Sequence, residues 1–194
     1  EQFQYAMNKD MGFAQENVTL VADYAPGSAT DLSAAGTDFT LRLTLERPAG
    51  DTNAGLTAYD VRMNFESSEF EVIGWSNQVG YLPAEYVVAK PDPATEGPDT
   101  DASVAYFHFT GVDLAGTATP ANGQLSQALF DVQLRTVAGA TYPLAIEFMQ
   151  NPRANRDQGP TVVFGPEEIE LPGSVTFDHS ALDGPITPTT TPPT

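Results

Sequence analysis

The stretch GLTAYDVRMNFESSEFEVIGW, residues Gly55–Trp75, carries the clearest strand pattern in the sequence. Between Ala58 and Phe65, apolar and polar residues alternate, and successive side chains of a strand point to opposite faces. The polar side places an acid, a base and an amide in register, at Asp60, Arg62 and Asn64. The sequence therefore predicts a strand with one polar face and one apolar face on a core. The apolar face consists of Tyr59, Val61, Met63 and Phe65.

Similar alternating segments recur along the chain and are separated by turn-forming residues. The chain has sixteen glycines and sixteen prolines, and no segment shows the period of an amphipathic helix. The sequence therefore predicts an all-β fold, a two-sheet antiparallel jelly-roll-like sandwich of about nine strands. The expected strands are Val18–Tyr24, Asp38–Glu46, Ala58–Phe65, Phe70–Trp75, Tyr86–Ala89, Ser103–Phe109, Gln127–Arg135, Tyr142–Met149 and Gly173–Phe177.

Length and hydrophobic content predict one domain with tails. The chain has 194 residues, 41% of them hydrophobic, which is enough for a single sizeable core. We expect residues 1–17 to be an N-terminal extension, 18–178 the sandwich, and 179–194 a Thr/Pro-rich tail or linker. The predicted core consists of Phe39, Leu41, Leu43, Val61, Met63, Phe65, Phe107, Phe109, Phe130, Val132, Leu134, Leu144 and Ile146.

The charge balance and composition exclude several classes of function. Twenty-six acidic residues against eight basic ones give a formal net charge of −18. Nucleic-acid binding needs Lys and Arg to replace phosphate counterions, so we expect no nucleic-acid partner. No apolar run approaches the roughly 20 residues of a membrane helix, so we expect no membrane insertion. The chain has no cysteine, which excludes disulfides, zinc–thiolate sites and a cysteine nucleophile.

Both ends of the chain favour an exported protein. The chain begins with Glu1 rather than Met, as it would after removal of a leader or after other trimming. The C-terminal segment GPITPTTTPPT, Gly184–Thr194, has the Pro/Thr composition of linkers in secreted proteins. We therefore expect an extracellular or cell-surface location.

Four sequence motifs follow one another along the chain. GLTAYDVRMNFESSEFEV is followed by SVAYFHF, by ALFDVQLRTVAGATYPLAIEF and by LPGSVTF. In this order they resemble the cohesins, the modules of cellulosome scaffolds that hold dockerin domains. The resemblance covers roughly Val18–Phe177, and the chain departs from a compact cohesin in its longer segments Tyr81–Asp101 and Gln150–Leu171 and in its extra N-terminal strand. The residues of the first motif that match the family pattern are Gly55, Leu56, Asp60, Val61, Met63, Phe65, Glu66, Phe70, Glu71 and Val72.

The resemblance implies a non-catalytic extracellular module that captures a dockerin-like domain through an outer sheet face. In such a fold, the strand Ala58–Phe65 lies in the middle of one sheet, between Ser103–Phe109 and Tyr142–Met149. The family's strand-opening Asp corresponds to Asp60, and an exposed apolar position of the family falls on His108. The implied protein-binding face consists of Asp60, Arg62, Asn64, Tyr106 and His108. An ordinary hydrated sheet face is the alternative.

Two other functions remain open from the residues. Phe3, Tyr5 and Met7 form the apolar side of a short N-terminal strand. This strand could dock on a sheet edge of its own domain or of another copy. The partner would then be a copy of the chain, and the protein a subunit of an extracellular filament or surface layer. A carbohydrate-binding module would instead expose aromatic rings such as Trp75, Tyr81 and Tyr86.

The sequence contains no recognisable catalytic arrangement. It has no Gly-x-Ser-x-Gly elbow, phosphate-binding loop or His-Glu-x-x-His motif. The two histidines, His108 and His179, lie far apart, and we expect His179 to be a solvated tail residue. We therefore expect no enzyme and no catalytic residue. Acid pairs arise by chance in so acidic a chain, for example Glu69/Glu71 and Glu167/Glu168.

Calcium and glycans are the two attached groups that the sequence suggests. No motif requires a cofactor, but one Pro-rich loop offers four carboxylates to calcium, which takes about six to eight oxygen ligands. A hydrated acidic loop is the alternative. If the source organism glycosylates exported proteins, we expect glycans on the sequon Asn17-Val18-Thr19 and on the C-terminal threonines. The carboxylates are Asp92, Glu96, Asp99 and Asp101, and the threonines are Thr187, Thr189, Thr190, Thr191 and Thr194.

Overall fold

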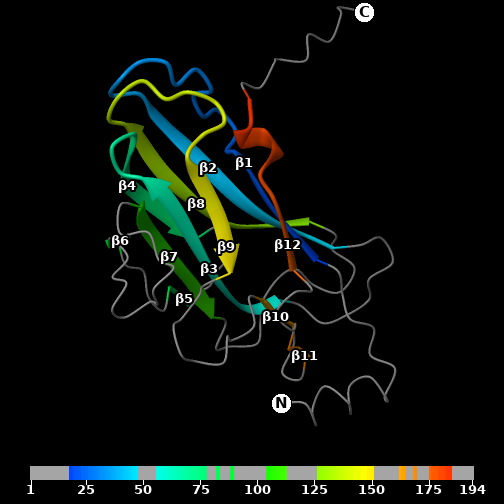
Figure 1. The fold of residues 1–194 in the computed structure, drawn as a ribbon. Helices are drawn as coiled ribbons and strands as arrows, with labels where there is room; N and C mark the ends of the chain where they lie inside the picture. Colours follow the sequence, from blue (N-terminus) through cyan, green and yellow to red (C-terminus); the bar gives the residue numbers. More distant parts are fainter. Residues whose placement is uncertain are drawn as a thin grey trace, which may run out of the picture.

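The computed structural model shows an all-β sandwich (Figure 1) and describes residues 18–47, 56–77, 82–83, 88–89, 104–112, 126–150, 162–164, 168–169 and 175–184. These residues form twelve strands and one short 3-10 helix, η1 (Ser180–Leu182). No helix in this part of the chain is long and apolar enough to span a membrane. The strands are β1 (Val18–Tyr24), β2 (Asp38–Glu46), β3 (Leu56–Glu66), β4 (Phe70–Asn77), β5 (Leu82–Pro83), β6 (Val88–Ala89), β7 (Val104–Val112), β8 (Ser126–Thr136), β9 (Ile146–Gln150), β10 (Val162–Phe164), β11 (Glu168–Ile169) and β12 (Val175–Asp178).

The strands form two sheets. Sheet A has the order β12-β1-β2-β8-β4, and sheet B has the order β11-β10-β3-β7-β5, with β9 also paired to β3 and β6 to β7. Among the described strands every pair is antiparallel except β1 with β12, which run parallel. Parallel neighbours need a long connection, and nearly the whole domain lies between these two strands. The predicted two-sheet sandwich is confirmed.

Strands β3 and β7 form the centre of sheet B because both edges of each are paired. β3 pairs with β7 along Ala58–Glu66, and its other side pairs with β9 and then β10. β9 pairs with residues 61–65 of β3 and β10 with residues 56–59, so the two strands lie end to end along it. β5 and β6 line the far side of β7 in the same way. The structure thus places β3 between β7 and β9, as the sequence predicted.

The core lies between the two sheets and contains every residue predicted for it. All thirteen of those side chains are buried. Phe109 of sheet B stacks on Phe130 of sheet A with ring centroids 3.7 Å apart, and Tyr59 lies 5.9 Å from the same ring of Phe130. Large rings on facing strands fill the space between sheets at little entropic cost. Trp75 is half-buried and packs against this core.

Strand β9 begins at Ile146 rather than at the predicted Tyr142. In the segment before it, Ala145 still accepts from the amide of Glu66 at the end of β3 (3.1 Å), but residues 142 and 144 bond to other parts of the fold. The amide of Leu144 donates to the carbonyl of Leu182 (2.9 Å), and the hydroxyl of Tyr142 donates to the carbonyl of Thr30 (2.8 Å). Local alternation cannot reveal such bonds, because their partners lie far away in the sequence.

The residues after β12 belong to the folded domain. Leu182 of η1 is 1% exposed and packs in the core near β1. The amide of Phe148 donates to Nε2 of His179 (2.8 Å), and the imidazole ring stacks near Phe148 and Phe177. The expectation that His179 is a solvated tail residue is therefore wrong. The folded domain continues past its expected end at residue 178, with η1 beside β1 (Figure 1) and Leu182 bonded to Leu144, two residues before β9.

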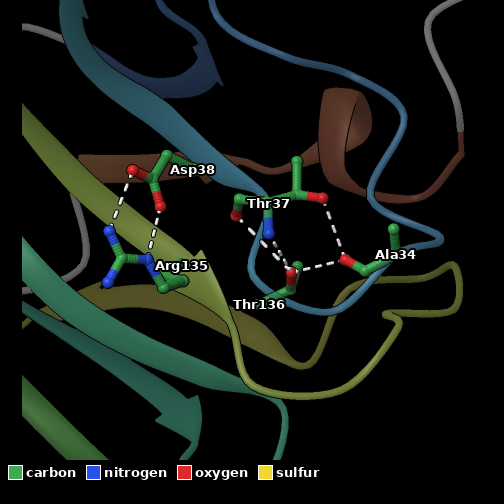
Figure 2. A network of polar contacts seen from close by, with 5 residues as sticks. All are labelled: Ala34, Thr37, Asp38, Arg135 and Thr136. Atoms are coloured by element: carbon green, nitrogen blue, oxygen red, sulfur yellow. Dashed lines mark hydrogen bonds and ion pairs between the residues drawn. The ribbon is translucent and has the colours of Figure 1, made fainter.

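The end of β8 fastens the loop that precedes β2 (Figure 2). The hydroxyl of Thr136 donates to the carbonyl of Ala34 (2.7 Å) and accepts from the amide of Thr37 (2.9 Å). Thr136 is buried, so these bonds are shielded from water. The preceding residue, Arg135, points to the other side of the strand and donates twice to Asp38, at 2.6 and 3.0 Å. One corner of sheet A is therefore held from both sides.

Several sequence predictions lie outside the described residues. They concern the N-terminal strand, the calcium loop, the glycosylation sites and two of the three candidate sugar-binding rings. Among the described residues, no group of histidines and acids could hold a metal ion. The predicted residues that lie outside the described part are Phe3, Tyr5, Met7, Asn17, Tyr81, Tyr86, Asp92, Glu96, Asp99, Asp101, Thr187, Thr189, Thr190, Thr191 and Thr194.

Candidate functional site

The outer side of sheet B carries the polar residues that the sequence singled out. The alternate side chains of β3 and β7 are buried in the core, so those between them point to the opposite face. All five residues predicted for the protein-binding surface lie on this face, together with two residues of β9. The sheet B face, as we call it, comprises Asp60, Arg62, Asn64, Tyr106, His108, Glu147 and Met149.

The strand register arranges the sheet B face in rows that cross the strands. Neighbouring strands lie about 4.8 Å apart, so side chains within a row and along the diagonals are in reach of one another. From β9 to β7, the first row is Glu147, Asn64 and Tyr106, and the second row is Met149, Arg62 and His108. Asp60 lies in a third row, opposite Thr110.

Arg62 organises the centre of the sheet B face. Its Nε donates to Oδ1 of Asn64 (2.7 Å), and its guanidinium carbon lies 4.0 Å from the ring centroid of Tyr106. The amide nitrogen of Asn64 in turn contacts the sulfur of Met149 (3.0 Å). A guanidinium over an aromatic face is attracted by the ring's negative π-density. Arg62 therefore connects β3 with β7, and through Asn64 with β9.

His108 and Asp60 form the second polar pair of the face. Nε2 of His108 hydrogen-bonds Oδ1 of Asp60, on the diagonal between neighbouring rows. The histidine side chain is 7% exposed, whereas the carboxylate is 29% exposed. The pair is a hydrogen bond when the ring is neutral and an ion pair when it is protonated. In both states it holds the carboxylate in a fixed orientation at the surface.

The sheet B face is less open than the sequence suggested. Arg62 and His108 are only 4% and 6% exposed, so His108 does not occupy an exposed position. Asp60, Asn64 and Tyr106 are half-buried. Arg62 lies back over its neighbour instead of extending into water, because a long side chain can cover a surface with its stem and head together. The buried side chains of Arg62 and His108 therefore hold their more exposed neighbours in position. Those neighbours are Asn64, Tyr106 and Asp60.

Glu147 and Met149 are members of the face that sequence reasoning missed. The sequence predicts the strand that contains them as the neighbour of β3, and they lie on its outward side. Glu147 is exposed and Met149 half-buried, and both alternate with the buried Ile146 and Phe148. The alternation of apolar and polar residues along this strand is the sequence signal that places Glu147 and Met149 on the outward face.

The outer side of sheet A holds its charges differently. Arg42 donates to both carboxylate oxygens of Asp131, at 2.8 and 2.9 Å, and Arg135 binds Asp38 in the same two-bonded way. The hydrogen bond from Arg135 lowers the pKa of Asp38, and the hydrogen bond to Asp131 raises the pKa of Arg42. The sheet A face, as we call it, comprises Asp38, Arg42, Glu71, Asp131, Gln133 and Arg135.

No protein-family model matches the chain, and no curated protein matches it. Among solved structures, the chain is similar to CaCohA2 from Clostridium acetobutylicum, with 12% identity, a TM-score of 0.49, and coverage of 88% of this chain and 96% of that one. It is also similar to the third cohesin ScaC of Acetivibrio cellulolyticus, solved with the ScaB dockerin, with 8% identity, a TM-score of 0.47, and coverage of 83% and 94%.

A third similar structure is the type III cohesin module of the cell-surface anchoring scaffoldin ScaE from Ruminococcus flavefaciens. It has 10% identity and a TM-score of 0.46, over 87% of this chain and 91% of that one. Each likeness is loose, since all three TM-scores are below 0.5. These three solved structures are all cohesin modules.

Proposed function

We propose that this chain is a non-catalytic, extracellular protein-binding module that captures a dockerin-like domain on the sheet B face. The observation that carries the proposal is the position of β3. The strand with the cohesin-like motif lies at the centre of sheet B, and its polar residues are joined to those of β7 and β9 in one surface. The net charge of −18 and the Thr/Pro-rich C-terminal segment support an extracellular location.

The sheet B face is organised before any partner arrives. Arg62 holds the ring of Tyr106 and the amide of Asn64, so these side chains lose little freedom on binding. Tyrosine is among the residues that most often anchor protein interfaces, because its ring offers a large area with few rotatable bonds. Half-exposed Tyr106 and Met149 therefore supply the anchoring surface.

Calorimetric titration of the full chain with a panel of purified dockerins tests the proposal. We expect at least one dockerin to bind, and Tyr106→Ala to weaken that binding by about thirtyfold, the equivalent of about 2 kcal/mol for an interface anchor. The matched control is Gln133→Ala, which truncates an exposed residue of the sheet A face. The control should bind like the wild type.

Two results would contradict this proposal. One is that no dockerin binds to the folded chain. The other is that Gln133→Ala weakens binding as much as Tyr106→Ala does, which would move the interface away from sheet B. Circular dichroism of both variants confirms that the comparison is made between folded proteins.

Self-assembly by strand exchange is the second candidate function. Within the described residues, β4 pairs only with β8, at the edge of sheet A, and it carries the exposed Ile73. A strand at the edge of a sheet can accept a strand from another chain. The donor would be the N-terminal strand with Phe3, Tyr5 and Met7.

Removal of residues 1–10 separates the two functions. Self-assembly predicts that the truncated chain stays a folded monomer while any polymer of the full chain is weakened or lost, as measured by light scattering. A full chain that stays monomeric at high concentration and binds a dockerin excludes it. The third alternative, carbohydrate binding, is weakened because Trp75 packs against the core.

A further inference from the structure

We propose that Met149 of the sheet B face is an oxidation site. A peroxide converts its thioether to a sulfoxide there, and the amide of Asn64 decides which of the two sulfoxide epimers forms. Two observations carry this: the exposure of the Met149 side chain and the hydrogen bond that its sulfur accepts. The effect on partner binding rests on the proposed function of the face, whereas the oxidation itself does not.

Met149 and Met63 are the two methionines of the described part, and they differ in exposure. They lie on the paired strands β9 and β3, with Met149 opposite Arg62 and Met63 opposite Phe148. Met149 points to the outer face and is half-buried, whereas Met63 points into the core and is 0% exposed. Oxidation follows exposure to solvent, so a dissolved peroxide reaches Met149 in the folded protein and Met63 only when the sheet opens.

The amide of Asn64 is held in one orientation beside the sulfur. Its Oδ1 accepts from Nε of Arg62 (2.7 Å), and its Nδ2 donates to Sδ of Met149 (3.0 Å). Turning the amide over would place its amino group against the guanidinium, which has donors and no acceptor, and would break both bonds. Because Arg62 is itself 4% exposed, the donor that faces the sulfur does not move freely.

The hydrogen bond from Asn64 makes the two sides of the sulfur unequal. A thioether sulfur has two lone pairs, and an oxygen atom added to one or the other gives opposite epimers of the sulfoxide. Nδ2 of Asn64 engages one lone pair, so the peroxide meets the other. That lone pair forms the new S–O bond while the O–O bond breaks. The sulfur gives up two electrons, and hydrogen peroxide leaves as water.

The sulfoxide changes the chemistry of the row formed by Met149, Arg62 and His108. It replaces a flexible, weakly accepting thioether with a polar, chiral group that carries a strong acceptor oxygen. A partner that packs on the thioether loses that contact. Oxidation therefore weakens partner binding, and reduction of the sulfoxide restores it.

Treatment of the full chain with dilute hydrogen peroxide, followed by peptide mass spectrometry, tests the oxidation site. We expect Met149 to gain its oxygen atom at least about tenfold faster than Met63, which reacts only in opened molecules. The epimers are separated with the two classes of methionine sulfoxide reductase, each of which reduces one epimer. In peptides that contain Met149, we expect one epimer in an excess of about threefold or more.

Asn64→Asp is the matched control for the choice of epimer. The carboxylate keeps an acceptor for Arg62 but has no donor for the sulfur, so the two epimers should form in nearly equal amounts. Oxidation of Met149 no faster than that of Met63 overturns the site. Equal epimers in the wild type, or an unchanged excess in Asn64→Asp, overturn the role of Asn64.

The effect on binding is measured by titrating the oxidised chain, freed of peroxide, with the dockerin that binds the untreated chain. We expect the Kd to rise about fivefold. Met149→Leu has a similar volume and no sulfur, so it should bind like the untreated wild type before and after peroxide. An equal loss of affinity in peroxide-treated Met149→Leu would contradict the effect. If no dockerin binds the untreated chain, the proposed function fails, and the mass spectra still decide the oxidation site.

Discussion

The outer faces of the two sheets hold their arginines in opposite ways. On the sheet A face, Arg42 and Arg135 reach across to a neighbouring strand, and each meets a carboxylate near the solvent. On the sheet B face, Arg62 lies back over Tyr106 and is 4% exposed. The same residue type therefore neutralises acids on one sheet and orients an aromatic ring on the other.

This difference separates two arginines that are already paired with acids from one that orients an aromatic ring. Paired charges at the surface of sheet A gain little by meeting another protein, because they would first have to give up their present partners. The sheet B face keeps a rigid centre and a carboxylate without a partner in the described part. The comparison can be tested by substitutions at matched positions of the two sheets.

The largest expected effect is the loss of stability when Gly111 of β7 is replaced by alanine. Gly74 of β4 is the matched position on the other sheet. A Cβ added at Gly111 would collide with the ring of Tyr59, which is 1% exposed and hydrogen-bonded to Asn77 (2.6 Å). A Cβ at Gly74 would come 2.6 Å from Oε1 of Gln133, the mobile end of an exposed side chain. We expect Gly111→Ala to lower the free energy of unfolding by about 3 kcal/mol, and Gly74→Ala by less than about 0.5 kcal/mol.

Urea unfolding of both alanine variants measures this difference. Neither glycine has a positive φ, so the comparison isolates the steric contact. Equal losses of stability would show that the centre of sheet B is no more tightly packed than the edge of sheet A.

The second comparison removes one arginine from each face. Arg62→Ala takes the charged donor from Asn64 and the cation from Tyr106, and we expect it to lower the free energy of unfolding by about 2 kcal/mol. Arg42→Ala breaks a more exposed pair with Asp131 and should lower it by about 1 kcal/mol or less. Unfolding in 0.1 M and 1 M salt adds a control: the Arg42 effect should shrink with salt, and the Arg62 effect should persist. A larger or more salt-resistant loss for Arg42→Ala would reverse the comparison.

The third prediction concerns His179, which links the two sheets. Its Nε2 accepts the amide hydrogen of Phe148, in the strand that carries Glu147 and Met149 of the sheet B face. His179→Ala leaves that amide without its acceptor, and we expect a loss of about 1 kcal/mol. Hydrogen exchange of the Phe148 amide should accelerate by about fivefold or more, since 1.4 kcal/mol corresponds to a factor of ten. Unchanged exchange would mean that the bond contributes nothing to holding β9.

The smallest effect is expected at Asp38, on the exposed pair with Arg135. The hydrogen bond from Arg135 lowers the pKa of Asp38 below its usual 3.8, so the charged form is favoured in the folded state. This contribution is present above the unfolded pKa and is lost as the pH falls through the lower folded value. Asp38→Asn should therefore be slightly less stable than wild type at neutral pH. The two proteins should converge in thermal unfolding below about pH 3. A difference that grows toward acid pH would have the wrong sign for this pair.

The fold was largely predictable because strand alternation is a local signal. Val61 and Phe109 could be assigned to the core from alternation alone, and the resemblance to cohesins placed β3 between β7 and β9. The short strands β5, β10 and β11 were missed because two or three residues are too few to show a period. The start of β9 was misplaced because Leu144 bonds to Leu182, a partner that alternation cannot reveal.

The candidate site was predictable in its membership but not in its organisation. Asp60, Arg62 and Asn64 alternate with core residues, so the sequence by itself determined that they share one outward face. Whether a side chain on that face extends into water or folds back depends on its neighbours from other strands. Only the tertiary structure decided that Arg62 is buried over Tyr106, and that Glu147 joins the face from β9.

The two histidines show the same division. The sequence determined that His108 lies on a strand with aromatic neighbours, because the alternation of β7 is local. Its bond to Asp60 and the bond of His179 to the amide of Phe148 were decided by strand pairing and by the return of the chain after β12. Periodicity is a property of a few consecutive residues, whereas burial and pairing depend on residues that only folding brings together.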